Sequence, residues 1–219
     1  HKQKRQAEGD LEARINSFEL AYRMQTDARE AFDIAGEKPE TVAKYGANAQ
    51  GRQMLIARRL LERGVRFVQV RQGGWDLHGG IAQRAANNAR QLDPAIGAIM
   101  DDLKERGLFE DTLIYITSEF GRSPTEDGGG GRSHNARGLS TVLMGGGIKG
   151  GIAYGSTDEI GGAAVENKVH VKDIHATVMD LLGFDHEQLT YRTAGRDFRL
   201  TQATRSLPQG GMPVKGIIA

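Results

Sequence analysis

The segment Thr112-Leu-Ile-Tyr-Ile-Thr-Ser118 carries the best strand pattern in the chain, and the expected fold class depends on it. β-Branched and aromatic residues dominate it, as in a strand that is covered on both faces. Apolar residues from Ala85 to Leu103 keep helical spacing before it, and Asp93-Pro94 within them indicates either a kink or a fresh helix start. A helix followed by a short connection and an apolar strand is typical of α/β proteins.

The same order of elements occurs elsewhere in the chain. Gln50 to Arg63 predicts a helix, and Val65 to Val70 predicts a strand directly after it. Leu139 to Met144 predicts a further apolar strand, and Ala176 to Leu182 predicts a short helix. Because helices alternate with mostly apolar strands, we expect an α/β fold with a mostly parallel sheet flanked by helices.

Three regions follow from these patterns. Residues 1–48 predict a helical segment and a loop, residues 49–200 predict the α/β domain, and residues 201–219 predict an irregular tail. The helical segment has one apolar face, formed by Leu11, Ile15, Phe18 and Tyr22.

Composition excludes several classes of function. The 219 residues include 29 Lys plus Arg and 28 Asp plus Glu, so the net charge of +1 disfavours a nucleic-acid partner. No apolar run approaches the roughly 20 residues of a membrane span, so we expect no transmembrane segment. The absence of cysteine excludes disulfides, thiolate zinc sites and a cysteine nucleophile within the chain. Glycine is abundant, at 30 residues, and indicates tightly turning loops.

The first candidate site is the segment Gln72-Gly-Gly-Trp-Asp-Leu-His-Gly-Gly80, after the predicted strand at residues 65–70. Asp76 and His78 are two positions apart, so in an extended segment both side chains point to the same side and can reach one cation. A carboxylate and an imidazole together suit zinc, manganese or iron. The alternative is a surface loop in which Asp76 caps the following helix.

The second and third candidate sites follow later in the chain. Glu119, at the end of the strand Thr112 to Ser118, is placed for a metal or for acid/base chemistry, and Arg122 could bind an anion. The alternative is a Glu119–Arg122 pair that holds the loop. Asp127-Gly-Gly-Gly-Gly-Arg-Ser-His-Asn135 resembles a loop that delivers a cation, Arg132, and a ligand, His134, with a flexible linker as the alternative.

Several motifs in one order resemble the DUF1501 family, which is abundant in planctomycetes and related bacteria. They are Gly73-Gly-Trp-Asp-Leu-His-Gly79, Leu103-Lys-Glu-Arg-Gly-Leu-Phe-Glu-Asp-Thr-Leu113, Glu119-Phe-Gly-Arg-Ser-Pro124, Gly145-Gly-Gly-Ile-Lys-Gly-Gly151 and Asp173-Ile-His-Ala-Thr177. The resemblance covers about residues 10–200. It implies membership of the alkaline-phosphatase-like and sulfatase-like superfamily, and the chain looks like the C-terminal half of such a fold, incomplete at its N-terminus.

The resemblance implies a metal-dependent hydrolase of phosphate or sulfate esters, acting on a small-molecule or glycan ester. Asp76 and His78 look like the first pair of metal ligands, Glu119 like the carboxylate of a second metal, and His134 like a histidine that returns to the first. Arg122 and Arg132 would stabilise the transferring anion. The implied cofactor is a divalent metal ion (zinc, manganese or calcium), and the implied location is extracytoplasmic.

Two departures from the family pattern favour a different function. Ser133 stands where family members commonly carry an aspartate, and the nucleophile-bearing segment of relatives lies upstream of His1. The alternative is therefore a catalytically degenerate binding or structural module. The sequence does not specify the substrate, the metal or the oligomeric state.

Overall fold

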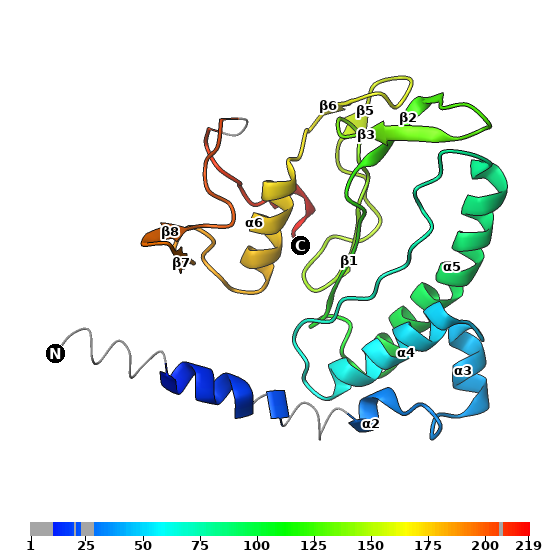
Figure 1. Ribbon diagram of the computed structural model, residues 1–219, viewed down its shortest axis with the longest axis vertical. Coiled ribbons are helices and arrows are strands. Elements are labelled where there is room, and N and C mark those ends of the chain that lie inside the picture. The colour runs from blue at the N-terminus through cyan, green and yellow to red at the C-terminus, as the bar shows by residue number, and fades with distance from the viewer. Residues whose placement is uncertain (1–10, 20, 23–28, 206–207) are drawn as a thin grey trace. The chain divides into compact units, whose positions relative to one another are not determined.

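The computed structural model describes residues 11–19, 21–22, 29–205 and 208–219 (Figure 1). The chain forms two compact units. Unit 1 holds the described residues up to Asp76 together with Gln83–Leu103, and unit 2 holds Leu77–Ala82 together with Lys104–Ala219. Buried apolar side chains occur in both units, such as Leu55 in unit 1 and Ile174 in unit 2.

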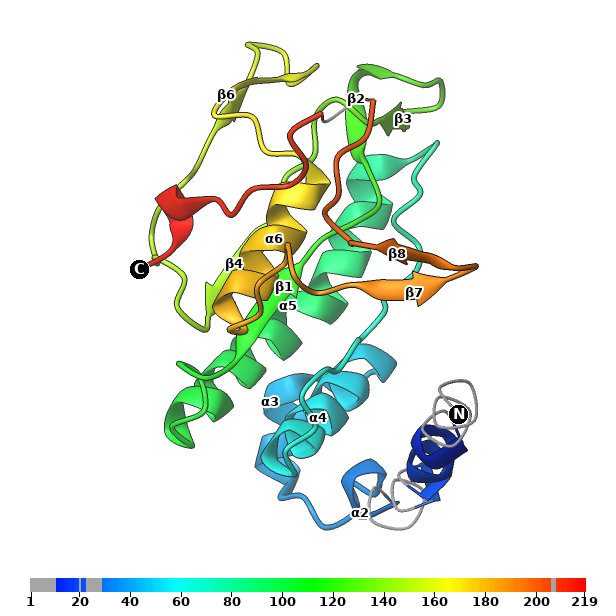
Figure 2. The ribbon, with the colours of Figure 1, turned by 90° about the vertical axis from the view of Figure 1, so that its left-hand side faces the viewer.

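Unit 1 is helical. Residues 11–19 and 21–22 are helical, and the helices that follow are α2 (Arg29–Phe32), α3 (Pro39–Tyr45), α4 (Ala49–Glu62) and most of α5 (Ile81–Glu105). Helix α4 contacts both α2 and α3, as Figure 2 shows. The helix predicted at Gln50 to Arg63 is confirmed as α4. It begins after Asn48, whose side-chain oxygen accepts a hydrogen bond from the Gly51 amide at 2.9 Å.

Asp93-Pro94 does not begin a new helix, because it lies within helix α5. Helix α5 has 25 residues and contains Pro94 in its interior. The predicted apolar face of the N-terminal helix is present but exposed, with Phe18 75% and Tyr22 69% accessible to solvent.

A network of buried charges holds α3, α4 and α5 together. The Tyr45 hydroxyl donates to Asp102 Oδ2 at 2.8 Å, and burial together with this carboxylate raises the pKa of Tyr45. Arg58 is 3% exposed, and its guanidinium lies close to the carboxylates of Glu37 and Glu62, each at 2.8 Å, and of Asp102 at 3.4 Å. A buried cation requires such partners, because an unpaired charge in the interior is strongly destabilising.

Unit 2 is built mainly from short antiparallel strand pairs. The pairs are β1 (Leu113–Ile116) with β4 (Val142–Gly145), β2 (Gly121–Glu126) with β3 (Arg132–Asn135), β5 (Ser156–Thr157) with β6 (Ala164–Glu166), and β7 (Tyr191–Thr193) with β8 (Arg196–Phe198).

The expected mostly parallel, alkaline-phosphatase-like sheet is wrong, because every strand pair among the described residues is antiparallel and two-stranded. The strand predicted at Thr112 to Ser118 exists as β1, but between β1 and its partner β4 the chain forms the β2–β3 hairpin. Parallel strands need a crossover connection, usually a helix, and none separates β1 from β4. The strand predicted at Val65 to Val70 is also wrong. That segment forms no strand, and Phe67 is 83% exposed.

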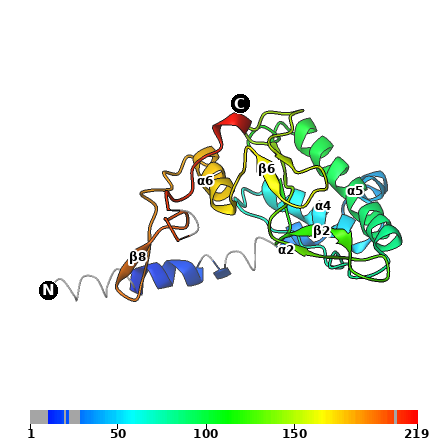
Figure 3. The same ribbon diagram turned by 90° about the horizontal axis from the view of Figure 1, so that it is seen from above.

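Helix α6 (Val171–Leu181) packs with the C-terminal end of the chain, as Figure 3 shows. His170 caps α6, since its Nδ1 accepts from the Lys172 amide at 3.2 Å, while the Asp173 carboxylate accepts from the His170 amide at 2.8 Å. The Val214 amide, just before the 3₁₀ helix η1 (Lys215–Ile217), donates to Thr177 Oγ1 at 2.9 Å.

Candidate metal centre

The β2–β3 hairpin, labelled in Figure 1, carries one side of the candidate site. Arg122 lies directly opposite His134 in its register, so both side chains are on the same face. Just before β2, the Phe120 ring stacks on the His134 imidazole, with ring centroids 3.9 Å apart and an interplanar angle of 28°. The stacking restricts the orientation of the His134 ring.

The segment Leu77–Gly80 lies along this hairpin and carries the other side of the site. The Arg132 amide donates to the Leu77 carbonyl at 3.0 Å, and the Gly80 amide donates to the Gly129 carbonyl at 2.9 Å. Leu77 is 2% exposed and anchors the segment. His78 is therefore held between two backbone contacts to the glycine-rich turn.

Gly131 makes this close approach possible. A Cβ atom at this position would lie 2.1 Å from the His78 carbonyl carbon and 2.2 Å from its oxygen. These are backbone atoms, which cannot move aside as a flexible side chain does, so the position requires glycine. The run of four glycines thus has a packing role at its last residue.

Two imidazoles meet at the centre of the site. His78 Nε2 lies 3.2 Å from His134 Nε2, and both side chains are exposed. On the other side of the His78 ring, Nδ1 lies 2.6 Å from Asp127 Oδ2. An ionised carboxylate only accepts hydrogen bonds, so Nδ1 carries a proton, and in the neutral imidazole the lone pair is then on Nε2.

The spacing of the two Nε2 atoms fits a transition metal. Two nitrogens bound to zinc at tetrahedral angles, each about 2.0–2.1 Å from the ion, lie roughly 3.3–3.4 Å apart. The observed separation of 3.2 Å is close to that value. The same distance also suits an N–H···N hydrogen bond between the two rings, which a metal ion would replace.

Asp76 supplies the third possible donor of the group, a carboxylate oxygen. Asp76 lies two residues before His78 in the chain. One ligand atom each from Asp76, His78 and His134 lies within 4.8 Å of the other two, and all three residues are exposed. The two-residue spacing noted in the sequence thus places an acid and an imidazole near one point.

A model of the family described as "Protein of unknown function (DUF1501)" matches residues 1–209. The chain belongs to the DUF1501 family. No curated protein and no solved structure matches it. The family predicted from the motifs is thereby confirmed, whereas the match supports neither the expected superfamily nor an assignment as a C-terminal half.

The other predicted site residues of this DUF1501 chain are not members of the Asp76–His78–His134 group. Glu119 is exposed in the bend before β2 and, among the described residues, is not part of the Asp76–His78–His134 group. Arg122 Nη1 donates to the Arg132 carbonyl at 3.2 Å, and its guanidinium carbon lies 5.3 Å from the Phe120 ring centroid. Arg132 Nη1 donates to the Gly131 carbonyl at 2.7 Å.

Two residues of the site received no role from the sequence. Asp127, at the start of the glycine run, orients His78 across 49 positions of sequence, and Phe120 stacks on His134. Both lie in segments that the sequence analysis identified as candidate sites. Their partners depend on the hairpin register, which no local pattern specifies.

In the described part of the DUF1501 chain, no helix combines the length and the apolar character of a membrane span.

Proposed function

We propose that this chain binds a divalent transition-metal ion through His78 and His134, with Asp76 as a third ligand. The observation that carries the proposal is the 3.2 Å separation of the two Nε2 atoms, with an Asp76 oxygen nearby. Two imidazoles and one carboxylate suit zinc, manganese or iron. Calcium, which takes oxygen ligands, fits this donor set poorly.

Asp127 supports the proposal from outside the ligand set. Histidines that bind metals usually donate their other ring N–H to a carboxylate or carbonyl, which fixes the tautomer and makes the ligating nitrogen more basic. Asp127 has this relation to His78, at 2.6 Å.

We further propose that the metal serves hydrolysis of a phosphate or sulfate ester. Three protein ligands leave a position for water, and a bound divalent ion would polarise the ester and activate that water. Arg122 is on the same face of the hairpin as His134 and would bind the anionic oxygens of the ester. It would exchange its bond to the Arg132 carbonyl for the substrate.

A binding module without turnover is the second candidate. It is favoured by the two arginines, since Arg122 and Arg132 each donate to a backbone carbonyl, and by the position of Glu119 outside the group of described ligands. In that case the metal would hold a ligand or a loop and catalyse nothing.

The test is metal titration of the purified chain by calorimetry, with zinc and manganese, together with elemental analysis. We expect about one ion per chain, and we expect His78→Ala and His134→Ala each to weaken binding more than about tenfold. His175→Ala is the matched control, because this partly buried histidine of α6 lies outside the site. Equal metal binding by all four proteins would exclude the site.

Turnover distinguishes the two candidates. Metal-loaded protein is assayed with p-nitrophenyl phosphate and p-nitrophenyl sulfate. Hydrolysis that is lost in His134→Ala supports the hydrolase, whereas stoichiometric metal without hydrolysis supports the binding module.

A further inference from the structure

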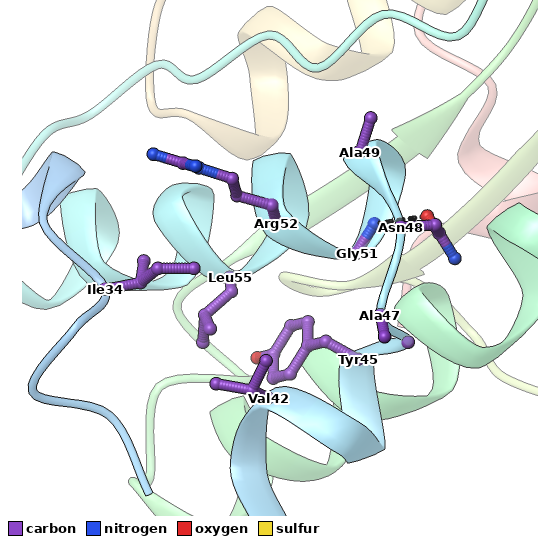
Figure 4. Close-up of a pocket in the computed structure, with 10 residues that line it drawn as sticks. Ile34, Val42, Tyr45, Ala47, Asn48, Ala49, Gly51, Arg52 and Leu55 are labelled. Carbon is purple, nitrogen blue, oxygen red and sulfur yellow. Dashed lines mark hydrogen bonds between the residues drawn. The ribbon is translucent and has the colours of Figure 1, made fainter. Parts of the chain in front are cut away.

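The apolar side chains of unit 1 fall into two groups. Those at the corner between α3 and α4, among them Tyr45 and Leu55, lie in the core and are almost inaccessible to solvent (Figure 4). Those of the helix before α2, at residues 11–19 and 21–22, are exposed. Exposed apolar side chains that gather on one face of a protein mark a surface for a partner.

The exposed side chains of this helix form a single stripe, the N-terminal stripe, which consists of Leu11, Ile15, Phe18 and Tyr22. Each of the four is between 49% and 75% exposed. They follow one another at intervals of four, three and four residues, which places them along one side of the helix, blue in Figure 1. Ile15 and Tyr22 are thus at the a positions of a heptad, and Leu11 and Phe18 are at the d positions. A helix this short is marginal in water without a partner.

The residues beside the stripe indicate what that partner is. Ile at an a position with Leu at a d position favours two parallel strands of coiled coil. In the same heptad Arg14 is at a g position, and Glu12 and Glu19 are at e positions, all three exposed. In a parallel pair of identical helices, a g residue lies beside the e residue five positions later in the other helix, so Arg14 would meet Glu19 of the second copy.

The opposite orientation is unfavourable for the same charges. In an antiparallel pair the e positions of the two helices face each other, which would bring Glu12 of one copy beside Glu19 of the other. Like charges in contact across an interface are repulsive. The charges therefore complement a second copy of this helix in the parallel orientation.

We propose that the N-terminal stripe binds the same stripe of a second copy of this chain, as a parallel two-stranded helix pair. Burial of the apolar stripe drives the association. Two symmetric ion pairs between Arg14 and Glu19 flank the apolar contact and set the orientation. The proposal uses one helix of unit 1 and does not depend on the metal centre.

The test is sedimentation equilibrium of the full chain between about 10 µM and 1 mM. Because the stripe is short, we expect a reversible monomer–dimer equilibrium with a Kd of about 100 µM. Ile15→Glu places a charge within the stripe and should leave only monomer. Ser17→Glu is the matched control, because Ser17 is exposed at a c position on the outer side of the same helix, and it should keep the wild-type Kd.

Exchange of charges tests the ion pairs. Arg14→Glu would place two acidic side chains together on each side of the helix pair and should weaken dimerisation about tenfold, as should Glu19→Arg through two arginines. The double variant Arg14→Glu/Glu19→Arg reverses the pairs and should recover the wild-type Kd to within about twofold. A double variant that is as weak as the single ones would overturn the proposed pairing.

A single cysteine tests the orientation, since the chain has none of its own. Oxidised Leu11→Cys should form a disulfide-linked dimer, because residue 11 meets itself only in a parallel pair, and Ser17→Cys should stay unlinked. The proposal is overturned by a chain that is monomeric throughout, by a dimer that persists in Ile15→Glu, or by the absence of the Leu11→Cys link. A monomer that binds anionic lipid vesicles, and loses them in Ile15→Glu, would also overturn it and assign the stripe to a membrane surface.

Discussion

At the scale of single residues, the orientation of one imidazole is central to the candidate metal centre. His78 meets Asp127 through Nδ1 and His134 through Nε2, so the two ring nitrogens have different partners. The carboxylate keeps a proton on Nδ1, so in the neutral imidazole the lone pair is on Nε2, which faces His134. Asp127 is thus a positioning residue that does not itself join the ligand group.

Removing the charge of Asp127 should weaken metal binding. We expect Asp127→Asn to lower zinc affinity about 10- to 100-fold, because an amide no longer fixes the tautomer of His78. Zinc titration by calorimetry measures the change. Asp111→Asn is the control, since Asp111 is also exposed in unit 2 and its side chain has no hydrogen-bond partner among the described residues. Unchanged affinity in Asp127→Asn would show that this carboxylate does not orient a metal ligand.

Glu37 makes stability depend on pH. Burial alone would raise the pKa of Glu37, but hydrogen bonds from Arg59 and Arg58 outweigh it and hold the pKa below its ordinary value of 4.5. The unfolded chain therefore takes up this proton at a higher pH than the folded chain. The resulting stabilisation is complete above pH 4.5 and is lost as the pH falls through the folded pKa.

We expect the free energy of unfolding of the wild type to fall in this acid range. Glu37→Gln should be less stable at pH 7, and its stability should depend less on pH below the ordinary glutamate range. Urea unfolding at a series of pH values measures both. Glu40→Gln, at an exposed position of α3, should keep the wild-type slope. The same slope in Glu37→Gln as in the wild type would contradict the role of the two arginines.

At the scale of elements, the hairpin and the segment beside it form the site together. The β2–β3 hairpin supplies His134, Arg122 and the glycine turn, and the segment Leu77–Gly80 adds His78 through backbone contacts to that turn. The two elements are distant in sequence, and the lack of a side chain at Gly131 lets them meet. The geometry of the imidazole pair thus depends on backbone packing.

A side chain at Gly131 should separate the two elements. In Gly131→Ala, the new Cβ would overlap the His78 backbone, so we expect a loss of stability of about 1–3 kcal/mol and weaker zinc binding. Gly150→Ala is the control, because its Cβ would meet nothing within 4 Å and its φ is negative. Thermal unfolding and zinc titration report the two effects. Wild-type behaviour of Gly131→Ala would mean that the segment is not held as described.

At the scale of the whole molecule, the sequence predicted single helices and strands better than it predicted which strands pair. The helices α4 and α6 and the strand β1 follow from apolar spacing within one segment, and the structure confirms them. The predicted parallel sheet was wrong, because the pattern within one strand does not say which distant strand pairs with it or in which direction. β1 pairs with β4 in antiparallel register, and Val65 to Val70 forms no strand among the described elements.

The same distinction applies to the site. Asp76 and His78 could be grouped from their spacing, since two residues in an extended segment share a side. The contact of His78 with His134 spans 56 positions and that with Asp127 spans 49, so both depend on the tertiary fold. The functions of Arg122, Arg132 and Glu119 in binding an ester or a second metal remain predictions.

The most direct measurement is X-ray absorption at the zinc edge of the zinc-loaded chain, compared with His134→Ala. We predict a first shell that includes two imidazole nitrogens at about 2.0–2.1 Å in the wild type and one fewer in the variant. A spectrum without ordered imidazole scattering, or one that the variant leaves unchanged, would contradict metal binding by His78 and His134.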